Sequence, residues 1–108
     1  MAVKKNLKPA VVKEVKHYTA NLVKAGIRPE SLIVFGSQVK GRSKPWSDID
    51  VCVVSRQFGK DRYSERVRLM LLTDDSSDRI EPHPYHPKDL VDKWDPLAHE
   101  IRTTGVVV

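Results

Sequence analysis

The N-terminal part of the chain carries apolar residues at the spacing of one face of an α-helix. Val12, Val15 and Leu22 follow one another at one or two helical turns, as the buried side of a helix requires. Pro9 suits the first turn, where its missing N–H group would have no helical partner, and Gly26 suits the end. We therefore predict a helix over residues 9–25.

Two continuous apolar segments predict strands. Residues 32–35 form a short run of branched and aromatic side chains, and residues 48–54 are rich in valine and isoleucine. Such runs are typical of buried strands. Because side chains alternate between the two faces of a strand, Asp48, Asp50 and Cys52 are expected on one face of the second segment.

The later part of the chain alternates helices and strands. We predict a helix over residues 61–72 with Tyr63, Val67, Met70 and Leu71 on one face. Residues 79–85 form a short strand, in which Pro82 and Pro84 remove N–H donors on the same side. That strand therefore pairs on one side only, or leaves the sheet there. Shorter elements follow: helices over 87–92 and 96–103, and a last strand over 106–108. The alternation predicts an α/β (α+β) fold, a mixed sheet with helices packed on it.

Composition narrows the class of protein. The 108 residues fit one domain spanning 1–108, with the basic residues 1–8 loosely held. The single cysteine, Cys52, excludes an intrachain disulfide and a multi-cysteine zinc site. No apolar run reaches the ~18–20 residues of a membrane span, so we expect a cytoplasmic protein. The net charge of +5 favours polyanionic partners such as nucleotides.

Four residues form a pattern that carries chemistry: Gly36 and Ser37 after the first strand, and Asp48 and Asp50 at the second. Glycine lets the backbone approach a ligand closely, and free N–H groups at the start of a helical turn bind anions. Adjacent carboxylates repel each other unless a cation lies between them, and carboxylates together with phosphate oxygens are the ligands of Mg²⁺.

This pattern resembles the signature of the polymerase-β-like nucleotidyltransferases, in which Gly-Ser is followed ten residues later by Asp-x-Asp. Here residues 38–47 are those ten. The short length and the pair Lys40-Gly41 resemble the minimal nucleotidyltransferases (the MNT group). Residues 95–105 are also similar to members of that group, so the resemblance spans roughly residues 10–108 and implies the polymerase-β-like fold.

The family usually has a third carboxylate on a later strand, beside the first two. Glu81 is our match, because it lies inside the strand predicted over residues 79–85. Asp78, three residues earlier and nearer the turn, is the rival. The family more often has aspartate here, so glutamate is a departure from the family pattern at the residue that would activate the acceptor.

The resemblance implies a role for each site residue. Gly36 and Ser37 would hold the triphosphate, with the ammonium group of Lys40 near the phosphates unless it is merely solvated. The carboxylates that would bind two Mg²⁺ ions, with Mn²⁺ as the alternative, are those of Asp48, Asp50 and Glu81. Glu81 would also accept the proton of the attacking hydroxyl.

The implied reaction moves a nucleoside monophosphate, AMP first among the candidates, from an NTP to an acceptor hydroxyl. Larger relatives carry an added helical domain for which this chain has no room. The resemblance therefore implies a separate helical partner of the HEPN type, with this chain as the antitoxin of a toxin–antitoxin pair. A homo-oligomer through the last strand, residues 106–108, is a further option.

Two other functions stay open. The chain could be a partner-binding antitoxin module without catalysis. It could also be a nucleotidyltransferase that acts on RNA or on a small molecule such as an aminoglycoside, although no aromatic-interleaved basic patch favours nucleic acid.

Several further residues are weighed against structural roles. Trp46 precedes Asp48 and could stack on a base, but shielding of the core is the more common role; Trp94 is expected in the core. His83 is not expected to bind a metal, because the neighbouring prolines should break regular geometry. Cys52 is expected to be a buried, inert thiol.

Overall fold

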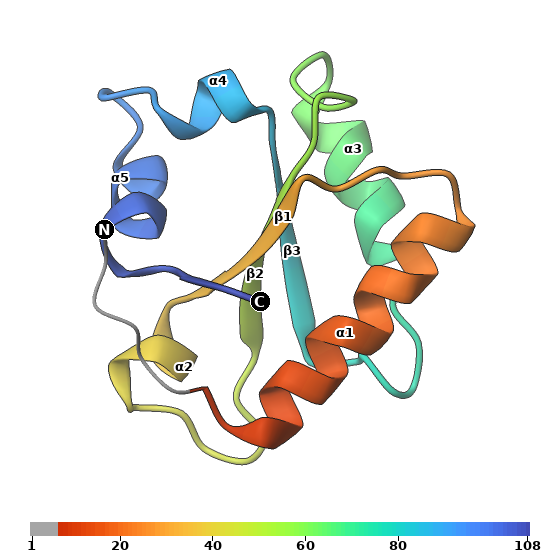
Figure 1. Cartoon of the computed structure of the whole chain (residues 1–108), viewed down its shortest axis with the longest axis vertical. Helices are drawn as coiled ribbons and strands as arrows, with labels where there is room; N and C mark the ends of the chain where they lie inside the picture. Colours follow the sequence, from red (N-terminus) through yellow and green to blue (C-terminus); the bar gives the residue numbers. More distant parts are fainter. Residues whose placement is uncertain (1–6) are drawn as a thin grey trace.

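A four-stranded mixed sheet forms the centre of the computed structural model, which describes residues 7–108. The strand order is β3-β2-β1-β4; β1 runs antiparallel to β2 and β4, and β2 runs parallel to β3. The strands are β1 (Ser31–Phe35), β2 (Ile49–Val54), β3 (Ile80–Tyr85) and β4 (Val106–Val107). Helices surround the sheet (Figure 1), so the predicted fold class is confirmed. The expectation for residues 1–8 falls mostly on residues 1–6, outside the described part.

The helices occur where the sequence predicts them, with small shifts at their ends. Their bounds are α1 (Pro9–Lys24), α2 (Ser37–Lys40), α3 (Arg62–Met70), α4 (Pro87–Leu90) and α5 (Pro96–Thr104). None of the helices in residues 7–108 has the length and apolar character needed to cross a membrane.

One face of the sheet is sealed by α1. This helix buries a stripe of Val11, Val15, Tyr18 and Leu22, which packs in one cluster with the β2 residues that point the same way. The hydroxyl of Tyr18 donates to the carbonyl of Leu69 in α3 at 2.6 Å. Because this bond is buried, it satisfies two polar groups that would otherwise cost about 1–3 kcal/mol each, and it fixes α1 against α3.

Helix α5 covers only part of the opposite face of the sheet. Ala98 and Ile101 of this helix pack with Phe35, Cys52 and Tyr85 of the sheet. Asp95 caps α5 by accepting from the N–H groups of Leu97 and Ala98, and it also accepts from the hydroxyl of Tyr85 at 2.8 Å. This carboxylate therefore fastens α5 to the end of β3.

β3 is an edge strand, which explains how it accommodates two prolines. Its hydrogen bonds to β2 use alternate residues, among them the carbonyls of Arg79 and Tyr85. Pro82 and Pro84 occupy the intervening positions, which face away from β2, so no ladder bond is lost. The prediction that this strand pairs on one side only is confirmed.

One prediction about the core is wrong, and one apolar helix face lies outside the core. The apolar face of α3 is exposed, with Tyr63 81% and Leu71 78% accessible. The helix instead buries Leu69, which meets Tyr18 of α1. Leu69 lies off the apolar face, since the residues three and four positions before it are Arg66 and Glu65, so its burial depends on the tertiary contact with α1. Trp94, expected in the core, is 82% exposed on the connection between α4 and α5.

Candidate functional site

Two carboxylates meet at the start of the parallel strands β2 and β3. Asp50 and Glu81 are register partners, each at the second position of its strand. Both lie on the face of the sheet that carries Cys52, away from the stripe of α1. Their side chains are half-buried, with exposed fractions of 28% for Asp50 and 39% for Glu81. The predicted strand faces are confirmed for Asp50 and Cys52.

Gly36 sits directly beside these carboxylates because β1 ends at Phe35, the antiparallel partner of Asp50. Its backbone has φ +79° and ψ −145°, a region that only glycine adopts readily. A Cβ atom at Gly36 would lie 2.5 Å from Oδ2 of Asp50. Both the backbone angle and the contact with Asp50 therefore require glycine. Ser37 begins α2 immediately afterwards.

His83 joins the two carboxylates. Its Nε2 lies 3.4 Å from Oδ1 of Asp50, and its ring packs at 5.2 Å, tilted, on Phe35. Asp50, Glu81 and His83 each offer one ligand atom, and these atoms all lie within 4.8 Å of one another. Sequence reasoning discounted His83 because of the prolines, yet the edge strand stays regular through them. The available signal was the i, i+2 spacing of Glu81 and His83, which places both on one face.

Glu81 is the later carboxylate that meets Asp50. Its rival, Asp78, lies exposed in the turn before β3. Oε1 of Glu81 accepts from the guanidinium of Arg66 in α3 at 3.0 Å. The sequence contains no local signal for Arg66, because the approach of α3 to the β3 edge is a tertiary contact.

Asp48 does not share this position. β2 begins at Ile49, so Asp48 is exposed just before the strand. Its backbone carbonyl accepts from Nε2 of Gln38 at 3.2 Å, which ties it to α2. Its carboxylate is outside the group formed by Asp50, Glu81 and His83.

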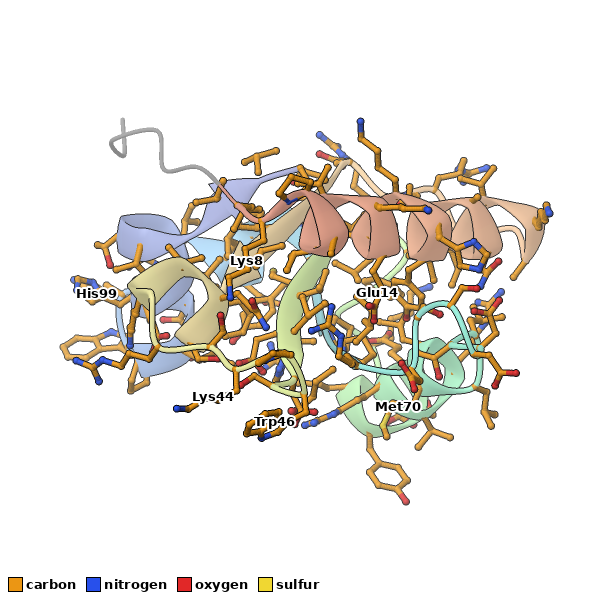
Figure 2. All side chains as sticks on the ribbon, turned by 90° about the horizontal axis from the view of Figure 1, so that it is seen from below. Lys8, Glu14, Lys44, Trp46, Met70 and His99 are labelled. Carbon is orange, nitrogen blue, oxygen red and sulfur yellow. The ribbon has the colours of Figure 1, made fainter. Side chains whose placement is uncertain are left out.

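Lys40 and Trp46 lie in the segment between the end of β1 and the start of β2. Nζ of Lys40 lies 3.5 Å from the carboxylate of Glu100, which links α2 to α5. Trp46 stands on a tight turn in which Ser47 Oγ accepts from the N–H of Lys44 at 2.7 Å. The indole is 74% exposed, so it does not shield the core. Figure 2 shows Trp46 and Lys44 on the side opposite α1.

Cys52 lies on the site face but under α5. It is fully buried, and burial raises the pKa of its thiol to about 12. The thiol is therefore neutral at physiological pH and cannot act as a nucleophile, in line with the predicted inert role.

The donor set fits a divalent cation. Two carboxylates and one imidazole converge within 4.8 Å, and such oxygen-rich sets bind Mg²⁺, Mn²⁺ and related ions. The only strong cation contact to these carboxylates, within residues 7–108, comes from Arg66 on one oxygen of Glu81.

Comparisons with known proteins show the family and the fold of the chain. Residues 12–96 match a family model described as a nucleotidyltransferase domain. Among solved structures, a candidate nucleotidyltransferase from Sulfolobus solfataricus superposes with a TM-score of 0.53 at 16% identity, covering 94% of this chain and 87% of that chain. At this identity the superposition shows a common fold. No curated protein matches the chain.

Proposed function

The chain belongs to the nucleotidyltransferase domain family, and we propose that it moves AMP from ATP to an acceptor hydroxyl using two Mg²⁺ ions. The observation that carries this proposal is the contact between Gly36 and Asp50. The Gly-Ser turn, where phosphates would bind, lies directly against the carboxylate that would bind a metal, since a Cβ atom at Gly36 would be only 2.5 Å from Oδ2 of Asp50.

The residues of the chain would divide the work as follows. Asp50 and Glu81, with Asp48 at the entrance to β2, would hold the metal ions, which supply charge neutralisation and activation of the attacking oxygen when bound. Gly36 and Ser37 would position the triphosphate through close backbone approach. Lys40 would contribute a positive charge only after leaving Glu100.

The proposed transfer is balanced without a further reactant. The acceptor oxygen forms a bond to the α-phosphorus, and the bond from that phosphorus to the bridging oxygen breaks. Pyrophosphate leaves with the electron pair, and the hydroxyl proton passes to Glu81. The protein contributes placement and electrostatic stabilisation rather than a covalent intermediate.

Trp46 would stack on the base of the nucleotide. Its indole is exposed on a turn closed by Ser47, and the carbonyl of Pro45 in that turn accepts from Arg79 at 2.9 Å. A rigidly presented ring loses little conformational entropy when a base stacks on it. In a Trp94→Phe variant, where Trp46 is the remaining tryptophan, we expect ATP to change the fluorescence and triphosphate alone to leave it unchanged.

The acceptor would lie on a helical partner protein of the HEPN type, with this chain as the cytoplasmic antitoxin. Support comes from the exposed apolar side of α3, which carries Tyr63, Val67 and Met70 in three successive turns. Arg66, on the same helix, contacts Glu81, so a partner on α3 would lie beside the site.

A second candidate, a partner-binding module without catalysis, is favoured by two observations. Asp48 lies outside the group of metal-binding atoms, and Arg66 already neutralises part of Glu81. This module would bind and mask its partner without NTP. The first candidate consumes ATP and requires a metal ion, whereas the second needs neither.

One experiment separates the candidates. The chain is incubated with α-labelled ATP, Mg²⁺ and the protein encoded by the adjacent gene, and ATP binding is measured in parallel by calorimetry. We expect label on the partner, and loss of both labelling and metal-dependent ATP binding in Asp50→Asn. The matched control is Asp75→Asn, an exposed carboxylate in the turn before β3. Unchanged labelling in Asp50→Asn would refute the assigned site, and masking of the partner without ATP would support the second candidate.

A further inference from the structure

We propose that His83 binds the same divalent ion as Asp50 and Glu81 through Nε2, which makes the centre bind Mn²⁺ and Co²⁺ more tightly than Mg²⁺. This inference rests on the proposed metal-dependent function but adds a ligand and a metal preference to it. The supporting observations are strand register, confinement of the imidazole and the chemistry of the donor atoms.

Strand register directs His83 to the carboxylates. His83 follows Glu81 by two residues on β3, so both side chains stand on the same face. Its register partner on β2 is Cys52, one step deeper under α5 than Asp50. From that position Nε2 points back to Asp50, at 3.4 Å from Oδ1.

The imidazole is confined before any ion binds. Its side chain is 15% exposed and packs on the ring of Phe35 at 5.2 Å. A ring held in this way loses little rotamer freedom on binding a ligand. The contact of 3.4 Å is long for a hydrogen bond, so Asp50 does not by itself account for the orientation of Nε2.

Neither Cys52 nor Arg66, the other groups near these side chains, takes the ligand position beside Asp50 and Glu81 that the imidazole of His83 occupies. Cys52 is fully buried, and its sulfur is not among the convergent ligand atoms. Within the described residues, Arg66 donates to Oε1 of Glu81, so the second oxygen of that carboxylate can bind an ion. The donor set is therefore two carboxylates and one imidazole nitrogen.

A nitrogen donor changes which ion is preferred. Mg²⁺ favours oxygen ligands and retains its water. Imidazole is a good ligand for transition metals, and affinity for mixed nitrogen and oxygen sites rises along the series from Mn²⁺ to Co²⁺. Because His83 supplies the nitrogen, its removal should weaken Mn²⁺ and Co²⁺ binding more than Mg²⁺ binding.

The test uses Mn²⁺ as the probe and does not depend on activity. Pulsed EPR of the Mn²⁺-loaded full chain is expected to show coupling to a histidine nitrogen, and uniform ¹⁵N-histidine labelling should change that coupling. His83→Gln should abolish the coupling and weaken Mn²⁺ binding at least about tenfold, the lower end of what even outer-shell metal partners contribute. The matched control is His99→Gln on the exposed side of α5, which should change neither.

Each outcome is decisive. Tight Mn²⁺ binding without nitrogen coupling in the wild-type chain would overturn the role of His83 and leave the proposed function intact. Absence of Mn²⁺ and Mg²⁺ binding would overturn the metal-dependent function itself. The isotope-labelled wild-type protein keeps the test valid if His83→Gln fails to fold.

Discussion

The two faces of the sheet show how neighbouring residues of one strand take on different tasks. Ile49, Val51 and Val53 of β2 are each 0% exposed and pack in the cluster sealed by α1. Asp50 points to the other face, where α5 reaches only the deeper part of the sheet. The face under α1 stabilises the fold, and the incomplete cover of the other face leaves room for polar chemistry. Because successive side chains of β2 point to opposite faces of the sheet, one strand contributes to both tasks.

The largest expected effect distinguishes Asp50 from its neighbour Ile49. Asp50→Asn should lower the nucleotidyl transfer rate about a thousandfold, because charge stabilisation by a metal contributes several kcal/mol, while the free energy of unfolding changes little. Ile49→Ala should lose about 2–5 kcal/mol of stability and keep the activity of its folded fraction. Rates and denaturant titrations measure the two effects. If both variants lost activity, or both lost stability, the two faces of the sheet would not differ in their tasks.

Glycine variants sharpen the comparison at the edge of the site. Gly36 and Gly26 both have positive φ, +79° and +85°, so alanine strains either backbone by roughly 1–2 kcal/mol or more. Only the Cβ at Gly36 meets Asp50; at Gly26 it meets nothing within 4 Å. Gly36→Ala should therefore abolish metal binding as well, measured by calorimetry. Equal metal binding in both variants would contradict the close contact.

A pair of tyrosines compares the two faces in stability. Tyr18→Phe leaves the buried carbonyl of Leu69 without its 2.6 Å donor and should cost about 1–3 kcal/mol. Tyr85→Phe removes the donor to Asp95, whose side chain is 20% exposed. Water can replace that donor, so the loss should be about 1 kcal/mol. Urea titrations measure both, and a reversed order would show that α5 is held more tightly than α1.

The smallest effect concerns acid and the cap of α5. Burial acts to raise the pKa of Asp95, but hydrogen bonds from Ala98, Tyr85 and Leu97 outweigh it and lower the pKa below its ordinary value. A lowered pKa stabilises the folded state above the ordinary value of about 4. That contribution is lost as the pH falls through the folded pKa. The protection of the α5 amides against hydrogen exchange should therefore fall below pH ~4 before that of the α1 amides does.

Asp95→Asn provides the control for the acid experiment. Asparagine caps a helix about as well as aspartate but does not titrate. Exchange in α5 of this variant should show a weaker dependence on acid. An unchanged acid response would mean that another group loosens the helix.

The local pattern of the sequence was sufficient for the elements but not for their contacts. Alternation correctly predicted that Asp50 and Cys52 share a face, since this depends on one strand alone. It does not apply to Asp48, because β2 begins one residue later. The meeting of Asp50 with Glu81 depends on the register of β2 with β3, which local patterns do not contain. The family resemblance supplied that contact.

The regular geometry around His83 and the packing of α3 depend on tertiary structure in a related way. Prolines beside His83 disrupt an interior strand but not an edge strand, and edge position is a property of the whole sheet. On α3, Leu69 is buried although it lies off the apolar face of Tyr63, Val67 and Met70. Its burial depends on the contact with Tyr18, which is known only when α1 and α3 are packed.

The prolines of β3 also determine how the sheet can grow. Its outer edge offers carbonyl oxygens, but Pro82 and Pro84 remove two of the donors that a further strand would require. A further strand on this side would therefore lack two of its backbone hydrogen bonds. The opposite edge, β4, consists of two valines, with Val107 66% exposed. Strand pairing with a second molecule is thus disfavoured at the edge beside Glu81 and less hindered at β4, the edge farther from the carboxylates.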